Sequence, residues 1–305
     1  MQIVALVLSC AIELKCFQLT QKMGRTLLKK LKYKYYWYLS ILRMQLALAK
    51  GAQSRQEADP EIPATWEYSV FSQNGEDGII NFLLSMCKKK NRYFVEIGAA
   101  DGLENNSANL AIVRKFSGIM VEGDPASSWR SKILGEFNMG VDHLNTFVTL
   151  KSLPDIIRRM RYPDPDFLSI DIDGNDYWIL NAFLNCQVRP KIICVEYNST
   201  YGPEKSVTIP YQENFYFKSA NPSGLYYGAS VNAFRKLMAG NGYKFVTVDF
   251  NGVNAFFVDP TYFEAGFLDK IKSLQFADNF FDVKRWEQSW VNRLPSISHH
   301  PLTEI

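Results

Sequence analysis

The sequence has few histidines and no regular spacing of cysteines. Only three histidines and five cysteines occur among its 305 residues. The cysteines are Cys10, Cys16, Cys87, Cys186 and Cys194. An odd number of irregularly spaced cysteines does not suit a disulfide framework, so we expect buried thiols and a reducing, cytoplasmic compartment. No paired Cys or His spacing marks a metal site, and His143 is expected just before a strand, so we predict no metal.

A long hydrophobic run is also missing. The longest apolar stretch near the N-terminus, "MQIVALVLSCAI", is shorter than the about 20 residues that a membrane-spanning helix needs. It lacks the basic start of a signal peptide. The letters "LVLSC" resemble a lipoprotein cleavage site, but the missing basic segment argues against that interpretation as well.

Charges of both signs are present but unevenly distributed. Residues 1–50 contain nine lysines and arginines against Glu13 alone, which gives +8, so the rest of the +3 chain carries −5. A basic segment on an acidic body indicates an anionic partner for the segment and no nucleic acid bound across the body.

The same basic segment contains an apolar stripe that recurs every three or four residues, which predicts an amphipathic helix. The stripe consists of Leu28, Leu31, Tyr35, Tyr38, Leu42 and Leu46. Two roles stay open for residues 22–50: packing on the protein's own domain or a partner helix, or peripheral attachment to an anionic membrane surface. The polar residues 50–63 are expected to be a linker, so residues 1–63 form a basic helical arm and linker.

From Tyr68 onward, strand and helix patterns alternate, which predicts an α/β domain over residues 64–260. The expected strands are Tyr93–Ile97, Gly118–Glu122, Thr146–Thr149, Phe167–Asp171, Ile192–Glu196, Phe245–Val248 and Ala255–Val258. The last two flank "DFNGVN", and an Asn-Gly pair between apolar strands is a strong hairpin signal. We therefore expect five parallel strands closed by an antiparallel hairpin.

Three further segments surround this sheet. A helix is predicted over Ser230–Ala239, ending at "GNG", where a glycine can adopt the left-handed cap. Residues 199–229 have little periodicity and are typical of a lid or binding loop. The tail, residues 261–305, is expected to be helical from Tyr262 to Lys284 and frayed at "SISHHPLTEI".

The turn after the first expected strand, "YFVEIGAADG", occupies the place where α/β sheets bind ligands. A dinucleotide fingerprint needs glycine at three positions, but here they hold Gly98, Ala100 and Leu103. Its acids, Glu96 and Asp101, would repel a pyrophosphate but attract the sulfonium cation of S-adenosylmethionine. The turn therefore indicates that cofactor.

The second expected strand ends in "VEGDP", which places two acids beside the same ligand site. Glu122 is positioned to accept hydrogen bonds from ribose hydroxyls. Asp124 either contacts the same ligand or caps the following helix.

These motifs, together with "YSVFSQNGEDGII", "FLSIDIDGNDYWI" and "VEYN", resemble the FkbM-type S-adenosylmethionine-dependent methyltransferases over roughly residues 68–258. The resemblance implies the Rossmann-like seven-stranded methyltransferase sheet and methyl transfer to a hydroxyl, often of a sugar or a natural product. An acceptor covered by the aromatic residues of 199–229 would fit a carbohydrate or glycolipid. It also implies a cofactor loop matched by Glu96, Gly98 and Gly102. Ala100 replaces the middle glycine, which requires ordinary backbone dihedral angles at that position.

A second acidic cluster, "FLSIDIDGND", ends the fourth expected strand. By the resemblance, Asp171 and Asp173 line the site, where a general base would take the proton of an acceptor hydroxyl. Glu196, at the end of the fifth expected strand, either positions the acceptor or satisfies local loop amides. Asp171, Asp173 and Glu196 are therefore the candidate catalytic residues.

Two other functions stay open at this point. The letters "SIDIDGN" resemble the start of a Mg²⁺-dependent phosphatase motif with Asp171 as the nucleophile. However, Asn175 stands where that motif has threonine, and no later acidic pair follows. The other alternative is a non-catalytic Rossmann-like module recruited through its basic arm. An EF-hand is excluded because Asp176 stands where its loop needs glycine.

Overall fold

A computed structural model of the chain describes residues 25–128, 131, 135 and 137–305. The apolar run "MQIVALVLSCAI" lies outside the described residues. The chain divides into two compact units, residues 1–42 and residues 43–305, which are considered separately. No helix among the described residues has the length and apolar content needed to cross a membrane.

The predicted basic helix is present and extends further than expected. Helix α2 covers Arg25–Glu57, so residues 50–57 of the expected linker are helical. This part was misjudged because its alanines, glutamines and charged residues are good helix formers even without an apolar stripe. In the first unit the stripe residues Leu31 and Tyr38 are exposed. A membrane or helix partner for this segment stays a prediction.

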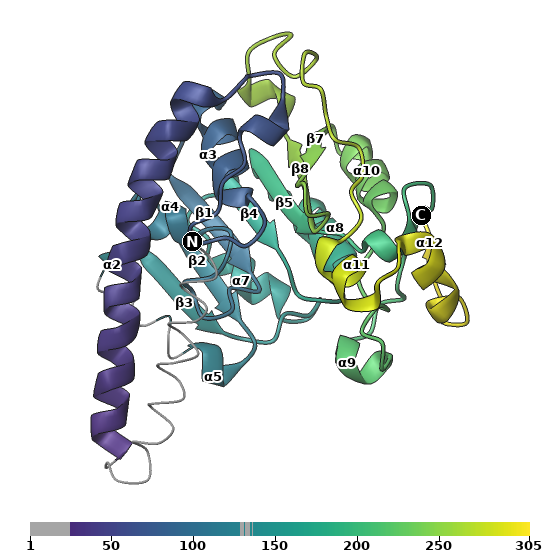
Figure 1. Cartoon of the computed structure of the whole chain (residues 1–305), viewed down its shortest axis with the longest axis horizontal. Coiled ribbons are helices and arrows are strands. Elements are labelled where there is room, and N and C mark those ends of the chain that lie inside the picture. Colours follow the sequence, from purple (N-terminus) through teal and green to yellow (C-terminus); the bar gives the residue numbers. More distant parts are fainter. Residues whose placement is uncertain (1–24, 129–130, 132–134, 136) are drawn as a thin grey trace. The chain divides into compact units, whose positions relative to one another are not determined.

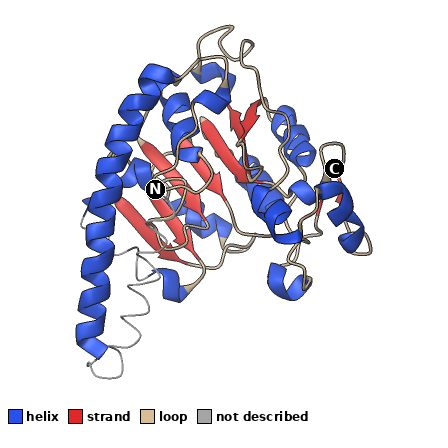
Figure 2. Ribbon diagram, viewed as in Figure 1, coloured by secondary structure: helices blue, strands red, loops and turns tan. Residues whose placement is uncertain are grey.

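The second unit is built on a seven-stranded sheet in the order β3-β2-β1-β4-β5-β8-β7, visible between the helices in Figures 1 and 2. Its strands are β1 (Tyr93–Ile97), β2 (Ser117–Glu122), β3 (Val141–Asn145), β4 (Phe167–Ile170), β5 (Ile192–Glu196), β7 (Lys244–Val248) and β8 (Asn254–Val258). Strands β1 to β5 pair in parallel, β8 pairs antiparallel with β5, and β7 and β8 form the antiparallel hairpin. The predicted seven-stranded sheet is confirmed.

The third strand was placed wrongly in the sequence. It was expected at Thr146–Thr149, whereas β3 covers Val141–Asn145 and the residues after it have no regular structure. Strand β3 lies at the sheet edge, where only Val141 is buried, so it lacks the apolar run that marks the inner strands. His143 is consequently part of the strand, opposite Met120 of β2, and burial lowers its pKa.

Helices cover both faces of this sheet (Figure 2). They include α3 (Glu76–Met86), α4 (Ala108–Ile112), α5 (Pro125–Ser128), α7 (Leu153–Arg159), α8 (Asp176–Asn185) and α10 (Val231–Gly240). Helices α7, α8 and α10 share one apolar core with side chains such as Val95 and Ile97. Alternate side chains of β1, Phe94 and Glu96, point to the opposite face, as expected from the two-residue period of a strand. Helix α10 begins one residue later than expected, because Ser230 is its N-cap.

The segment 199–229 and the chain's last residues form a small structure of their own. It contains η2 (Ser199–Tyr201), β6 (Val207–Thr208), α9 (Phe217–Ala220), α12 (Trp290–Arg293), η4 (Leu294–Ile297) and β9 (Thr303–Glu304). Strand β9 pairs antiparallel with β6, and Ile297 joins the apolar cluster of the segment. The tail "SISHHPLTEI" was therefore wrongly predicted to be frayed, because its pairing partner lies about 100 residues away in sequence.

The expected helix from Tyr262 to Lys284 is also mostly wrong. Only η3 (Pro260–Tyr262) at its start and α11 (Phe280–Trp286) at its end are helical. The residues between them form turns and an irregular stretch, in which the Leu274 carbonyl accepts from the Val248 N–H and the Ala277 carbonyl accepts from the Tyr197 hydroxyl. These long-range hydrogen bonds satisfy the backbone without a helix.

Candidate active site

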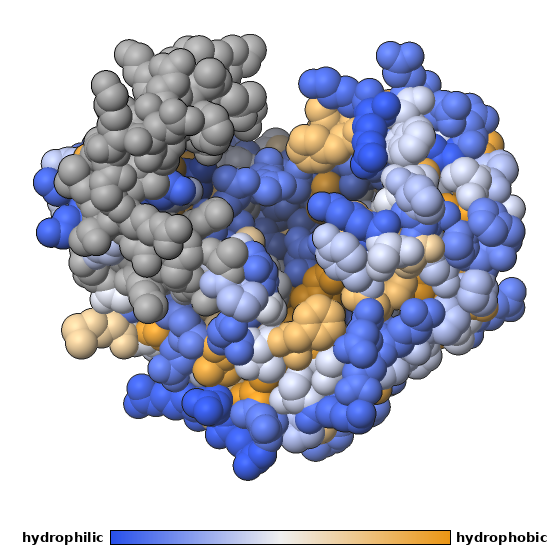
Figure 3. Space-filling model, turned by 90° about the horizontal axis from the view of Figure 1, so that it is seen from below, coloured by the Kyte–Doolittle hydropathy of each residue, from blue (hydrophilic) through white to orange (hydrophobic). Residues whose placement is uncertain are grey.

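A cavity of about 600 Å³ opens at the carboxyl ends of β1, β2, β4 and β5. Figure 3 looks at the molecule from below in Figure 1 and shows a hollow with hydrophilic residues in its depth and hydrophobic residues near its rim. The cavity is lined by eight carboxyl groups: Glu76, Glu96, Glu104, Glu122, Asp124, Asp171, Asp173 and Glu196. No lysine or arginine is among the described residues that line it. Its volume is typical of a pocket for a small molecule.

The turn after β1 forms the floor of this cavity. Gly98 has a φ of 89°, and a side chain there would begin 1.7 Å from the Asp171 carbonyl oxygen, so only glycine fits. Glu96 is fully buried, accepts a hydrogen bond from the Asn106 N–H at 3.2 Å, and interacts with the side chains of Ser107 and Ser169. Burial raises the pKa of Glu96 to about 8. This carboxyl group therefore holds its proton near neutral pH.

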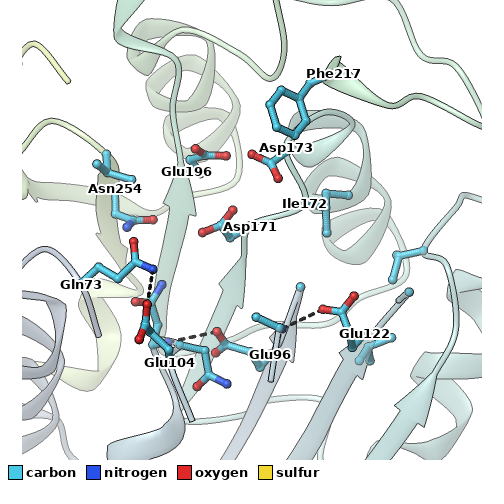
Figure 4. Close-up of a pocket in the computed structure, with 18 of the residues that line it drawn as sticks. Gln73, Glu96, Glu104, Glu122, Asp171, Ile172, Asp173, Glu196, Phe217 and Asn254 are labelled. Atoms are coloured by element: carbon cyan, nitrogen blue, oxygen red, sulfur yellow. Dashed lines mark hydrogen bonds between the residues drawn. The ribbon is translucent and has the colours of Figure 1, made fainter. Parts of the chain in front are cut away.

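Ala100 does not have the ordinary dihedral angles that the sequence comparison required. Its φ is 47°, in the left-handed region that costs an alanine roughly 1 kcal/mol. The Ala100 N–H donates to Glu122 Oε2 at 2.7 Å, and the Asp124 N–H donates to Glu122 Oε1 at 2.7 Å. The strained turn is therefore tied to the end of β2 by this carboxylate (Figure 4).

The remaining predicted cofactor residues divide into two groups. Asp124 lines the cavity and also accepts hydrogen bonds from the Ser127 N–H and hydroxyl, so both of its expected roles are compatible with its position. Asp101 and Gly102 are not among the lining residues. Asp101 Oδ1 instead accepts from the N–H groups of Leu103 and Glu104, at 2.9 and 3.0 Å, and so stabilises the turn.

The three predicted catalytic residues lie together at the other end of the cavity. Carboxylate oxygens of Asp171, Asp173 and Glu196 come within 4.8 Å of one another, and Figure 4 shows Asp173 and Glu196 above Asp171. Glu196 is buried, Asp171 is half-buried and Asp173 is exposed with a φ of 52°. Burial, followed by the charges of the neighbouring acids, raises the pKa of Asp171 and Glu196 well above the ordinary range.

Neighbouring polar residues of the same motifs are used to build the turns. Asp176 begins α8 and accepts hydrogen bonds from the Ile172 and Gly174 N–H groups, both at 2.8 Å. The side chain of Asn198 donates to the Leu225 and Tyr227 carbonyls and accepts from the Thr200 N–H. These contacts hold the 171–176 turn and the 199–229 segment in place.

Several lining residues were missed by the sequence analysis. Asn254 at the start of β8 lies opposite Glu196 in the strand register, and Glu104 accepts a hydrogen bond from Gln73 Nε2 at 2.9 Å. An aromatic wall, defined here as Phe147, Phe215, Tyr216, Phe217 and Phe281, completes the cavity. The aromatic content of residues 199–229 was the only signal for part of this wall, and Phe281 comes from the tail.

The chain is similar to known methyltransferases. A family model described as "Methyltransferase FkbM domain" matches residues 89–245, more than half of the chain. A search of curated proteins gave no significant match. Among solved structures, an O-methyltransferase from Bacillus cereus in complex with SAH is 18% identical, covers 71% of this chain and 89% of that chain, and has a TM-score of 0.42.

A second similar structure is the O-methyltransferase TomG from Streptomyces achromogenes in complex with SAM. It is 18% identical, covers 69% of this chain and 87% of that chain, and has a TM-score of 0.41. A third is a protein from Klebsiella pneumoniae whose O-methyltransferase activity is unconfirmed. It is 14% identical, covers 70% of this chain and 87% of that chain, and has a TM-score of 0.40. These similarities are too distant to carry an argument, so the family match is the informative comparison.

Proposed function

Because the chain belongs to the FkbM methyltransferase family, we propose that this S-adenosylmethionine-dependent enzyme methylates a hydroxyl oxygen of a carbohydrate, glycolipid or natural-product acceptor. Family membership leaves the phosphatase and the non-catalytic module without support. The oxygen specificity and the class of acceptor are the parts that we propose.

The observation that carries the proposal is the chemistry of the cavity wall. Eight carboxyl groups line it, and no lysine or arginine does so among the described residues. Phosphate groups are usually bound by arginine, lysine or backbone N–H groups at a helix N-terminus. A cationic sulfonium and uncharged hydroxyl groups suit this wall far better than a nucleotide phosphate does.

The residues at the β1 and β2 ends fit the cofactor. Glu122 reaches the cavity at the place where α/β sheets bind a ribose, and its oxygens already accept backbone hydrogen bonds, so its position is fixed. Glu96 lines the cavity at the end of β1, beside Glu122 at the end of β2. Gly98 lets the backbone approach closely at the same point.

The residues at the β4 and β5 ends suit the acceptor. Bound S-adenosylmethionine would supply an activated methyl group, leaving the bonding electron pair on sulfur when that group passes to the acceptor oxygen. The acceptor hydroxyl must lose its proton in this step, and Asp171, Asp173 and Glu196 are the nearby groups that can receive it. Since the methyl donor is already activated, most of the rate enhancement would come from aligning the two ligands.

The aromatic wall supports a sugar-like acceptor. Tyr216 and Phe281 are 55% and 50% exposed although they line the cavity. Such rings can cover the apolar face of a sugar, while the carboxyl groups accept hydrogen bonds from its hydroxyls. The segment that carries Phe215 is anchored to the catalytic turn, because the Asn175 amide donates to the Gln212 carbonyl at 2.7 Å.

The direct test is isothermal titration of the full chain with S-adenosylmethionine. We expect binding of one molecule, and about 10- to 100-fold weaker binding for Glu122→Ala, which removes a charged hydrogen-bond acceptor. Glu204→Ala, an exposed acid outside the cavity, is the matched control and should bind as the wild type does. Absence of binding, or equal affinity in Glu122→Ala, would contradict the proposal.

Transfer of a labelled methyl group to a panel of glycans and glycolipids then tests the acceptor. Label on a hydroxyl oxygen supports the proposal. Label only on nitrogen would overturn the oxygen specificity while leaving the cofactor assignment intact.

A further inference from the structure

We infer that the acceptor end of the cavity is a binding site for one divalent cation of the oxygen-preferring kind, Mg²⁺ or Mn²⁺, held by Asp171, Asp173 and Glu196. No metal was predicted from the sequence, because the Cys and His residues have no paired spacing and Asp176 stands where an EF-hand loop needs glycine. The site instead consists of carboxylates that come from the ends of β4 and β5 and meet only in the folded chain.

The first argument is the unmatched charge of this cluster. Three carboxyl groups whose oxygens lie within 4.8 Å repel one another when ionised. None of them forms an ion pair with a lysine or arginine of the described part of the chain. Burial raises the pKa of Asp173, and the positive charge of Lys218 opposes this rise from a distance. The Lys218 side chain is exposed and forms no ion pair with that carboxylate. When the three groups are ionised, a divalent cation would compensate the negative charge for which the described part of the chain supplies no ion-pair partner.

A second, independent observation comes from Asn254 on β8. It is 2% exposed, and its Oδ1 is buried without a hydrogen-bond partner. Its Nδ2 donates to Glu76 Oε1 at 2.8 Å, which fixes the orientation of the amide, because the reverse orientation would place Oδ1 against that carboxylate. Figure 4 shows the Asn254 side chain pointing into the space beside Asp171.

Glu196 lies beside Asn254 within the cluster. It is 8% exposed, pairs in register with Asn254, and shares a hydrogen bond with Asp171. A buried polar oxygen without a partner, such as Asn254 Oδ1 at the same end of the cavity, is a place where an unseen water or ion can bind.

The chemistry of the donors selects the ion. All candidate ligands are carboxylate or amide oxygens, which suit Mg²⁺, Mn²⁺ and Ca²⁺ and not the softer Zn²⁺ or Cu⁺. Mg²⁺ typically binds through one or two carboxylates and keeps open positions for water or substrate oxygens. If the proposed function holds, an acceptor hydroxyl would take one such position, and the cation would stabilise the oxygen as its proton leaves.

The experiment measures Mn²⁺ binding to the full chain without cofactor or acceptor. Protein stripped with a chelator and dialysed is titrated with Mn²⁺, free Mn²⁺ is followed by electron paramagnetic resonance, and Mg²⁺ is added as competitor. We expect one Mn²⁺ per chain, displaced by Mg²⁺, with at least tenfold weaker binding in Asp171→Asn and Glu196→Gln. Glu104→Gln is the matched control: this carboxylate lines the same cavity but is paired with Gln73 and Arg43, so its loss should leave Mn²⁺ affinity unchanged.

Asp173→Asn is the variant least expected to misfold, because Asp173 is exposed and the fold can accept an asparagine there. It too should weaken Mn²⁺ binding, and thermal unfolding confirms that each variant is folded. Absence of Mn²⁺ binding in the wild type, or equal binding in all three cluster variants, overturns the inference. The S-adenosylmethionine titration is run separately and without metal. Absence of cofactor binding would overturn the proposed function, whereas absence of Mn²⁺ binding would overturn the cation site alone.

Discussion

The two ends of the cavity use the same functional group in opposite ways. At the β1 and β2 end, Glu96 and Glu122 accept backbone hydrogen bonds, and Glu104 is held by a glutamine and an arginine. At the β4 and β5 end, Asp171, Asp173 and Glu196 face one another without an ion pair in the described part of the chain. The carboxyl groups of the first end are held in place by hydrogen bonds from the protein, whereas those of the second end mainly face one another.

This difference shows why a count of acidic residues says little about function. A carboxylate that accepts two backbone N–H groups is part of the fold, and removing it exposes unsatisfied donors. A carboxylate surrounded by other carboxylates weakens the empty protein and gains its favourable contacts only on binding. Mutations should therefore have opposite effects on stability at the two kinds of position.

The largest expected effect concerns Glu96 and pH. Its pKa in the fold is about 8, above the ordinary 4.5, so the folded chain holds this proton while the unfolded chain releases it. Stability should therefore fall as pH rises from about 4.5 to 8, by at most about 1.4 kcal/mol per pH unit. Chemical unfolding of metal-free protein between pH 5 and 7.5 should show a steeper decline for the wild type than for Glu96→Gln. Parallel curves for the two proteins would contradict a buried, protonated Glu96.

The next effect compares two acids of one turn. Asp176→Ala should destabilise the fold by about 2–3 kcal/mol, because the Ile172 and Gly174 N–H groups lose their acceptor. Asp171→Asn, measured without metal, should be neutral or stabilising by up to about 1 kcal/mol, because it relieves repulsion with Asp173 and Glu196. Denaturant titration of both variants measures the contrast. If both variants lost similar amounts of unfolding free energy, the carboxylates that accept backbone hydrogen bonds would not differ in stability effect from those that face other carboxylates.

The smallest effect concerns the strained alanine. Ala100→Gly should raise stability by up to about 1 kcal/mol, since glycine adopts a φ of 47° without the steric cost. Differential scanning calorimetry should show a rise of about 2–4 °C in the unfolding temperature. Affinity for S-adenosylmethionine should be kept or improved. A lower unfolding temperature would show that the alanine methyl group makes contacts worth more than the strain.

The parts of the fold that the sequence predicts are those with strong local patterns. Strands β1 and β5 begin and end where expected, because each is a short, fully buried run that is mainly apolar and has one acid at or near its end. Strand β3 was misplaced because an edge strand buries only one of its residues. The pairing of β9 with β6 has no local signal, since it depends on two segments about 100 residues apart.

The site follows the same rule. Glu96, Glu122, Asp171 and Glu196 end neighbouring parallel strands, so their common location could be predicted from the strand order alone. The location of Asn254 could not be predicted in this way, because its place beside Glu196 depends on the register of the β5 and β8 pairing. The φ of 47° at Ala100 also had no signal in the sequence, and the Ala100 N–H contacts Glu122 from a separate strand end.

The contact between Gly98 and the Asp171 backbone has a consequence for the geometry of catalysis. The Asp171 N–H donates to the Ile97 carbonyl at 2.9 Å, and Gly98 leaves no room between the two chains. The turn assigned to the methyl donor and the turn assigned to the acceptor are thus joined main chain to main chain. Under the proposed function, the distance between these two turns is therefore set by hydrogen-bonded backbone and not by side-chain rotamers.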